Sequence, residues 1–295
     1  MRVVVTGASG LIGSRLVGRL RGRGDEVVVL SRSGGDGAVG WDPVGGPAPV
    51  EALAGADAVV HLAGENIAQR WTAGARERIR ASRVVGTANL VAGISAAEPR
   101  PRVLVCANAV GYYGDRGDEL LSEDAAAGDD WLAAVCVGWE RAALAAVELG
   151  LRVCVLRTGV VLDRDGGALA KMLPPFQAGV GGPVAGGRQY ISWIHADDVV
   201  SFYLAAIDDE RLESPLNAVA PHAVRNAEFS KALGHALHRP ALAPIPGFAL
   251  RLRFGEMAAI VTDSQNVQPA RALELGLDFA HPELGEALAD ALSRR

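Results

Sequence analysis

The stretch TGASGLIG, residues 6–13, decides the fold of this chain. It follows the apolar run RVVVT (Arg2–Thr6), which is typical of a buried strand, and it opens the helix-like segment Leu11–Leu20. Its glycines have the spacing G-x-x-G-x-x-G and are Gly7, Gly10 and Gly13. Between a strand and a helix, such glycines allow a tight turn, a close approach of the backbone to a pyrophosphate, and close helix packing. The stretch therefore predicts a dinucleotide-binding loop, with the phosphates at the N-terminus of the helix.

The residues around this loop alternate between short β-branched runs and helix-like segments. The predicted strands are Arg2–Thr6, Glu26–Leu30, Ala58–Leu62, Val103–Ala107 and Val153–Arg157, and the predicted helices are Leu11–Leu20, Ala75–Ala97 and Trp131–Glu148. This alternation is typical of parallel sheets that are covered by helices on both faces. We therefore predict an α/β protein with a Rossmann-like, doubly wound parallel sheet.

The second half of the chain has a different rhythm. Residues 163–192 are rich in Gly and Pro, which predicts long loops around a short helix. Further helices are expected near Asp198–Ile207, Asn226–Leu237, Pro246–Met257 and Pro282–Leu292. We expect a cofactor domain over 1–162 with returning segments 193–220, a substrate-side region over 163–245, and a small helical C-terminal domain over 246–295. The parts after 162 would form a smaller, substrate-capping unit.

Composition narrows the range of partners. The chain of 295 residues has a net charge of −5 and no run rich in Lys or Arg, which gives no reason to expect nucleic acid or an anionic membrane. The three cysteines lie far apart in apolar segments, as buried thiols of a reducing compartment do. No apolar run is long enough to span a bilayer. We expect a cytoplasmic protein acting on a small molecule, and the sequence gives no indication of its oligomeric state.

The end of the second predicted strand bears on the choice of cofactor. NAD-preferring sites usually place an acidic residue there to bind the ribose 2′-hydroxyl. This chain has Ser31, Arg32 and Ser33 instead, and a guanidinium between two hydroxyls suits a 2′-phosphate. We therefore predict NADP(H) as the cofactor.

Several longer motifs resemble the extended short-chain dehydrogenase/reductases. These are TGASGLIG, HLAG (His61–Gly64), GYYG (Gly111–Gly114), LRTGVVL (Leu156–Leu162) and WIHADDV (Trp193–Val199). A closer resemblance is to their atypical "epimerase family" branch, whose members have a short extra C-terminal domain. It rests on AGENIA (Ala63–Ala68) with Arg70-Trp71, SRVVGT (Ser82–Thr87), the run Gly166–Pro183, VRNAEF (Val224–Phe229) and VQPARALELG (Val267–Gly276). The resemblance covers essentially the whole chain.

The resemblance implies a set of cofactor-binding residues. The glycine loop would lie along the pyrophosphate, the end of the second strand would meet the 2′-phosphate, and the HLAG motif would run beside the adenosine. Arg83 is a further candidate contact, and Val160 would line the nicotinamide side. The implied residues are Thr6, Gly7, Gly10, Leu11, Ile12, Gly13, Ser31, Arg32, Leu62, Ala63, Gly64, Arg83 and Val160.

The usual catalytic pair of this superfamily, Tyr-x-x-x-Lys on one helix, is missing. In that pair the Lys ammonium lowers the pKa of the phenol so that it exchanges a proton near neutral pH. Here Val135 stands at the Tyr position and Trp139 at the Lys position, and Asn108 stands near the usual hydroxyl. Tyr112 is the better candidate for a proton role than Tyr113, which matches a position that normally packs. The candidate catalytic residues are therefore Asn108 and Tyr112.

Several other side chains have either a structural or a functional interpretation. Cys136 is expected to be buried, and Glu140 either orients a group at the site or lies on the surface. The Gly- and Pro-rich region gathers candidate substrate-side residues, of which we select Lys171, Arg188, Tyr190 and Trp193. Asp197 and Asp198 are expected to cap the helix that follows them. His235 and His238 lack neighbouring carboxylates or thiols, so we predict no metal site.

Two functions remain open. The first is an NADP(H)-dependent oxidoreductase or epimerase/dehydratase-like enzyme acting on an unidentified small molecule. The second is a catalytically inactive NADP(H)-binding protein with a regulatory or structural role. The elaborate substrate-side motifs favour the enzyme.

Overall fold

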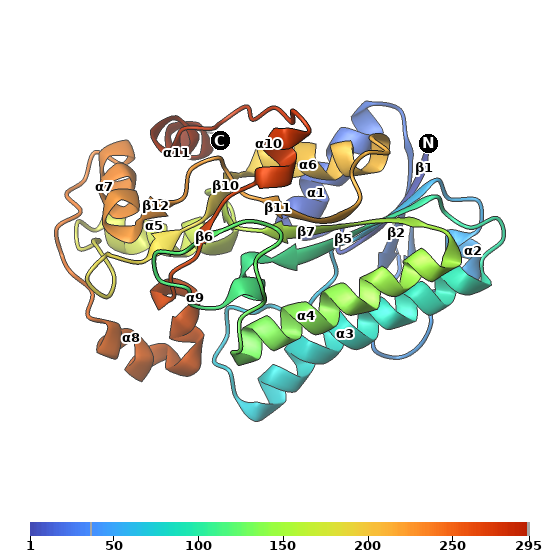
Figure 1. The fold of residues 1–295 in the computed structure, drawn as a ribbon, viewed down its shortest axis with the longest axis horizontal. Coiled ribbons are helices and arrows are strands. Elements are labelled where there is room, and N and C mark those ends of the chain that lie inside the picture. The colour runs from blue at the N-terminus through green and yellow to red at the C-terminus, as the bar shows by residue number, and fades with distance from the viewer. Residues whose placement is uncertain (36, 294–295) are drawn as a thin grey trace.

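The computed structural model describes residues 1–35 and 37–293, and its centre is a seven-stranded parallel sheet (Figure 1). The strand order is β3-β2-β1-β4-β5-β7-β11. The strands are β1 (Arg2–Thr6), β2 (Glu26–Ser31), β3 (Ala38–Gly40), β4 (Ala58–His61), β5 (Val103–Ala109), β7 (Arg152–Thr158) and β11 (Ser214–Ala218). The order reverses between β1 and β4, and at such a point a crevice opens beyond the carboxyl ends of the strands. The predicted fold class is confirmed.

Helices cover both faces of the sheet, as Figure 1 shows. One face carries α1 (Leu11–Gly22) and α6 (Ala196–Asp208), and the other carries α2 (Val50–Leu53), α3 (Ala73–Ala96) and α4 (Trp131–Leu144). In β1, Val3 and Val5 pack toward α1 and α6, whereas Val4 packs toward the α2–α3 side. Because both faces are covered, the middle positions of the central strands are apolar on both faces, which explains their strong signal in the sequence.

The rest of the chain forms a smaller part built on three two-stranded sheets. β8 (Val160–Leu162) pairs with β10 (Trp193–His195), β9 (Tyr190–Ile191) with β12 (Val224–Arg225), and β6 (Leu120–Leu121) with β13 (Asn266–Val267). Its helices are α5 (Gly167–Gln177), α7 (Asn226–Ala236), α8 (Gly247–Phe254), α9 (Ala259–Thr262), α10 (Ala270–Glu274) and α11 (Leu284–Ser293). The 3₁₀ turns are η1 (Val110–Tyr113), η2 (Ala145–Leu149) and η3 (Gly255–Ala258). The β6–β13 pair ties the C-terminal segment to the loop that follows β5.

The sequence did not predict β3, β8, β10, β11 or α2 as elements. β11 reads SPLNA, and its Pro and Asn hide the strand signal. It forms because it is an edge strand, where a missing N–H is tolerated, and because its register against β7 is set by residues far away in the chain. The predicted helix Trp131–Glu148 is shorter than expected, since α4 ends at Leu144 and η2 completes the segment.

None of the helices in the described part of the chain is both long and apolar enough to cross a membrane.

Candidate functional site

The glycine loop lies where the sheet order reverses, and its backbone leaves no room for side chains. Gly7 has a φ of +69°, and a Cβ there would lie 2.7 Å from the carbonyl carbon of Leu62. A Cβ on Gly13 would collide with the carbonyl oxygen of Gly7. The helix α1 begins at Leu11 with Gly10 as its N-cap, and no side chain caps its first N–H groups. The loop is thus a cradle that side chains would fill, at a helix end that suits an anion, and a dinucleotide pyrophosphate fits it.

Thr6 stabilises this loop from behind. Its hydroxyl lies 2.7 Å from Nδ1 of His61 and accepts hydrogen bonds from the N–H groups of Leu62 and Ala63, each at 3.1 Å. Since the oxygen accepts from two amides, its own proton points to Nδ1 and the His61 proton lies on Nε2. Complete burial, with a contribution from nearby Arg83, lowers the pKa of His61 to about 4. His61 is therefore neutral at physiological pH and joins the ends of β1 and β4.

The predicted 2′-phosphate residues stand at the end of β2, the strand next to β1. Ser31 is half-buried and Arg32 is exposed there. Leu62 and Ala63 are half-buried and Gly64 is exposed beyond β4, where they face the same crevice from the other side of the glycine loop. The fold thus brings together the three segments that the sequence assigned to the cofactor.

Arg83 reaches the crevice from α3. Its Nη1 donates hydrogen bonds to the carbonyls of Glu65, at 3.0 Å, and Ile79, at 3.3 Å. Its guanidinium lies over the ring of Trp139, 5.1 Å from the ring centre. Burial lowers the pKa of Arg83 from its usual value, yet a guanidinium keeps its proton at physiological pH. A preorganised cation therefore lies between the loop after β4 and helix α4.

Helix α4 carries buried apolar residues at the positions of the usual catalytic pair. Val135 is 3% exposed and Trp139 is 6% exposed. Because valine and tryptophan have no side-chain group that exchanges protons, neither residue can replace the usual catalytic pair. Burial raises the pKa of the Cys136 thiol to about 12, which keeps it protonated and excludes it as a nucleophile near neutral pH.

Glu140, on the same helix, is the centre of a buried polar network. Its carboxylate accepts from Nε of Arg157 at 3.0 Å and from Nη2 at 2.8 Å, and the side chains are 9% and 2% exposed. Although burial opposes the charge, the hydrogen bonds to Glu140 raise the pKa of Arg157 above its usual value. Arg157 also donates to the Tyr113 hydroxyl at 2.9 Å, and that hydroxyl donates to Asn217 at 2.7 Å. The network joins the carboxyl ends of β5, β7 and β11.

The sequence left Glu140 between two interpretations and did not identify Arg157 or Asn217 as its neighbours. A further member is Glu123, whose carboxylate accepts from the backbone N–H of Asn217 at 3.0 Å. The available signal was the presence of Glu140 and Arg157 inside apolar segments, because buried charges occur almost only with partners.

Asn108 belongs to this network. Its amide donates to the carbonyl of Cys136 at 3.1 Å and to Glu140 at 3.3 Å, and its own oxygen accepts from the N–H of Ala109. These contacts point its side chain at α4 and suit a positioning role. Tyr112 is half-buried, and the guanidinium of Arg157 lies 3.5 Å from its ring centre. Of the two candidate catalytic residues, Tyr112 has the more accessible side chain.

The structure spreads the four substrate-side candidates over different surroundings. Lys171, in α5, donates to the carbonyl of Ala68 at 3.4 Å and so reaches the AGENIA loop. Tyr190 is half-buried under Arg225, whose guanidinium lies 4.0 Å from its ring centre, while Arg188 is exposed. Trp193 is 1% exposed and donates its indole N–H to the carbonyl of His222 at 3.1 Å. Its placement is that of a packing residue.

A cavity of about 460 Å³ lies within the C-terminal part, in a segment that the sequence did not assign to the substrate. Burial, together with the neighbouring carboxylates of Asp115 and Asp130, raises the pKa of Asp263 at its wall to about 6. Glu256 forms an ion pair with Arg76 of α3, which ties this cavity to the carboxyl edge of the sheet. The cavity is lined by Arg251, Gly255, Glu256, Ala258, Ala259, Thr262 and Asp263.

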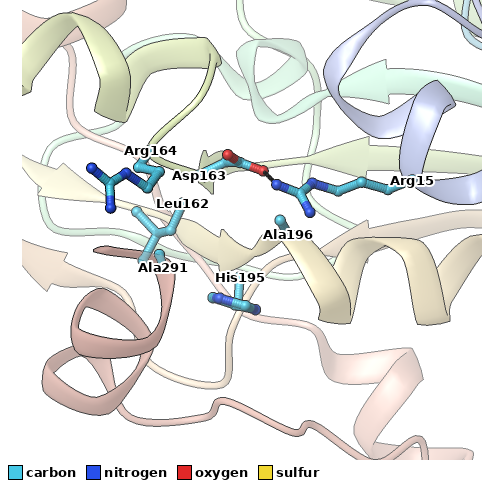
Figure 2. Close-up of a pocket in the computed structure, with 7 residues that line it drawn as sticks. All are labelled: Arg15, Leu162, Asp163, Arg164, His195, Ala196 and Ala291. Carbon is cyan, nitrogen blue, oxygen red and sulfur yellow. Dashed lines mark ion pairs between the residues drawn. The ribbon is translucent and has the colours of Figure 1, made fainter. Parts of the chain in front are cut away.

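A second, much smaller recess lies near α1, α6 and α11. Figure 2 shows Asp163 pointing at Arg15, with which it forms an ion pair, and the ring of His195 below Ala196. The side chains of His195, Asp197, His281 and Asp290 approach one another here, with one possible metal-ligand atom of each within 4.8 Å of the others. The sequence predicted no such cluster, because its members come from segments more than 80 residues apart.

One hydrogen bond and one ion pair lie within this cluster. Nδ1 of His195 accepts from the backbone N–H of Asp197 at 3.2 Å. Nε2 of the same ring lies 3.2 Å from a carboxylate oxygen of Asp290, on α11. The cluster serves to fasten α11 to the first residues of α6.

The chain is similar to known proteins over its whole length. The model of the NAD dependent epimerase/dehydratase family matches residues 3–218, and the domain of unknown function DUF1731 matches residues 245–291. An Arabidopsis thaliana protein named "Epimerase family protein SDR39U1 homolog, chloroplastic" is 42% identical over 298 residues, covering 98% of this chain and 86% of that protein.

Solved structures of similar proteins have the same fold. The crystal structure of human epimerase family protein SDR39U1 (isoform 2) with NADPH has a TM-score of 0.91 at 36% identity and covers 100% of both chains. That of a nucleoside-diphosphate sugar epimerase from Corynebacterium glutamicum has a TM-score of 0.81 at 37% identity and covers 99% of this chain and 58% of that one. The chain belongs to the NAD dependent epimerase/dehydratase family and carries a DUF1731 domain after the family's cofactor-binding part.

Proposed function

We propose that this protein binds NADP(H) at the carboxyl ends of β1, β2 and β4 and acts as an oxidoreductase or epimerase/dehydratase-like enzyme on a small organic molecule. The observation that carries the proposal is the glycine cradle, in which side chains on Gly7 or Gly13 would collide with backbone. The human relative that was crystallised with NADPH supports the choice of cofactor.

Each segment of the crevice would have its own role in binding. The N–H groups at the start of α1 would hold the pyrophosphate, with Thr6, Leu11 and Ile12 shaping the loop around it. Ser31 and Arg32 would bind the 2′-phosphate, since a hydroxyl and a guanidinium both donate to phosphate oxygens. Leu62, Ala63 and Gly64 would line the adenosine side, and Val160 the nicotinamide side.

When bound, NADP(H) supplies or accepts a hydride. Val135 and Trp139 would exclude water from the nicotinamide side. Tyr112 would hold or accept a proton at its hydroxyl, and Asn108 would act through the position of α4. The cavity at Arg251 and Asp263 offers a place for a small substrate beside the loop that carries Tyr112, whereas Lys171, Arg188 and Tyr190 would act from α5 and β9. Trp193 would support these residues by packing.

A catalytically inactive, NADP(H)-binding role is the second candidate. The observation that favours it is the composition of α4, whose buried face offers Val135 and Trp139 where proton transfer is expected. Detection of hydride transfer to any carbonyl compound would exclude this role.

Titration of the protein with NADPH and NADH, followed by cofactor fluorescence, tests the proposal. We expect NADPH to bind roughly tenfold more tightly, since one charge-assisted hydrogen-bonded pair contributes about 1.5–3 kcal/mol and the exposure of Arg32 favours the low end of that range. Arg32→Ala should remove most of this difference. Arg21→Ala, which changes an exposed arginine at the other end of α1, should leave it unchanged. Equal affinities of the unchanged protein for the two cofactors would refute the 2′-phosphate assignment.

A further inference from the structure

Helix α4 lacks a positive charge where the Tyr-x-x-x-Lys pattern would place an ammonium. Trp139 stands at that position and is 6% exposed. The neighbouring helix α3 brings a guanidinium to the same place, because Arg83 stacks over the Trp139 ring with 5.1 Å between the guanidinium carbon and the ring centre. The two helices approach closely here, since a Cβ on Gly138 would lie only 3.1 Å from the side chain of Val84.

Arg83 is held in place by three kinds of contact. It donates to the carbonyls of Glu65 and Ile79, it stacks on Trp139, and it lies against Gly64, where a Cβ would be 3.3 Å from its guanidinium carbon. A side chain on Gly64 would therefore press on the guanidinium. These contacts fix Arg83 at the crevice and use only part of its donor capacity.

Among the described residues, no carboxylate forms an ion pair with Arg83, although the charge of Glu65 acts on it. Glu65, whose backbone carbonyl accepts from Arg83, turns its carboxylate to Gln69, at 3.0 Å, and to Arg78, at 3.7 Å. By contrast, the buried Arg157 is paired with Glu140. A largely buried cation without an ion-pair partner interacts more strongly with a charge on a ligand bound nearby.

Sheet topology identifies which end of a dinucleotide this cation meets. Arg32 follows β2, on one side of β1, which is the side of the adenosine half in such folds. Arg83 contacts the loop after β4 and helix α4, which follows β5, on the other side of β1. In the proposed site Gly64 lies on the adenosine side, so Arg83 meets the nicotinamide side through Trp139 of α4, which stands where the usual pair places its lysine.

We propose that Arg83, positioned by Trp139, supplies the positive charge beside the nicotinamide that the lysine supplies in the usual pair, and that it makes the site favour reduced over oxidised cofactor. The oxidised nicotinamide ring carries a positive charge and the reduced ring is neutral, so a fixed cation opposes only the oxidised form. This inference rests on the proposed binding of NADP(H). It makes Arg83 a cofactor-facing residue and Trp139 a positioning residue.

The test is the ratio of the dissociation constants for NADP⁺ and NADPH, measured by calorimetric titration of the whole chain. We expect Arg83→Met to lower this ratio by roughly tenfold, the effect of one charge several ångströms away in a partly buried site. Arg83→Lys, which keeps the charge, should retain most of the ratio, and Trp139→Leu should lower it in part. The control is Arg80→Met, an exposed arginine of the same helix that pairs with Glu77, and it should leave the ratio unchanged.

Equal weakening of both cofactors by Arg83→Met, or an unchanged ratio, would overturn the inference and reduce Arg83 to a contact of either form. Failure of the unchanged protein to bind NADPH would instead overturn the proposed function itself. If Arg83→Met does not fold, Arg83→Gln carries the same expectation, since it keeps amide donors for the two carbonyls and removes the charge.

Discussion

Replacement of Glu140 by Gln tests whether the buried network holds the carboxyl end of the sheet together. The substitution keeps the size of the side chain and one accepting oxygen but removes the negative charge. Arg157, whose side chain is 2% exposed, would then remain charged without a carboxylate. Removal of one partner from a buried pair costs roughly 3–5 kcal/mol, and the oxygen that Gln retains places the expected loss near 3 kcal/mol.

Urea unfolding followed by tryptophan fluorescence measures this loss as a change in midpoint at constant slope. In a thermal melt the same loss corresponds to a decrease in Tm of roughly 5 °C for a chain of this size. The matched control is Glu148→Gln, which changes an exposed acid just beyond α4 and should cost less than about 0.5 kcal/mol. A Glu140→Gln variant within about 1 kcal/mol of the unchanged protein would show that Arg157 does not depend on this carboxylate.

Two further predictions concern the glycine loop and His61. Gly13→Ala should abolish NADPH binding and destabilise the fold, because its Cβ would collide with the Gly7 carbonyl. The control is Gly18→Ala on the same helix, where a Cβ meets nothing within 4 Å. It should preserve binding and raise the free energy of unfolding by roughly 0.5–1 kcal/mol. Tight NADPH binding by Gly13→Ala would refute the cradle. Burial lowers the pKa of His61 from its ordinary value of 6.5 to about 4 in the folded protein, so its contribution to stability is fully present above pH 6.5 and is lost as the pH falls toward 4. His61→Asn should flatten the pH dependence of unfolding in that interval by about 2–3 kcal/mol, and an unchanged slope in the variant would contradict a buried neutral His61.

The parts of the fold that the sequence predicted are those with a local signal. β1, α1 and the glycine loop between them follow from neighbouring residues, since strand composition, helical periodicity and glycine spacing are all readable within Arg2–Gly22. β11 has no such signal, because it is held by its register against β7, and Cys154 pairs with a residue 60 positions later in the chain. The same limit hides the His195 cluster, whose members meet only when α11 packs against α6.

The candidate site also contains parts with a local sequence signal and parts without one. The cofactor segments could be located because each adjoins a recognisable strand end. The contacts of Glu140 could not, because its partners Arg157 and Asn108 are 17 and 32 residues away and lie on strands of the sheet. The cavity at Asp263 could not be found either, since its wall comes from short helices that contain few buried residues and leave little periodicity in the sequence.

Helix α4 has the place in the fold of the helix that carries the usual catalytic pair, but it has Val135 and Trp139 at the two positions of that pair. The Lys of the usual pattern needs solvent or a counterion around its ammonium, whereas Trp139 is buried and can pack directly against the sheet. That exchange leaves the crevice without a cation from α4, and Arg83 brings one from α3 through its contact with the Trp139 ring. Glu140, one residue further along, turns to Arg157 and is neutralised there. Charge is therefore divided around α4, with Glu140 paired to Arg157 and Arg83 held against the Trp139 ring. The proposed preference for reduced nicotinamide depends on the second of these charges.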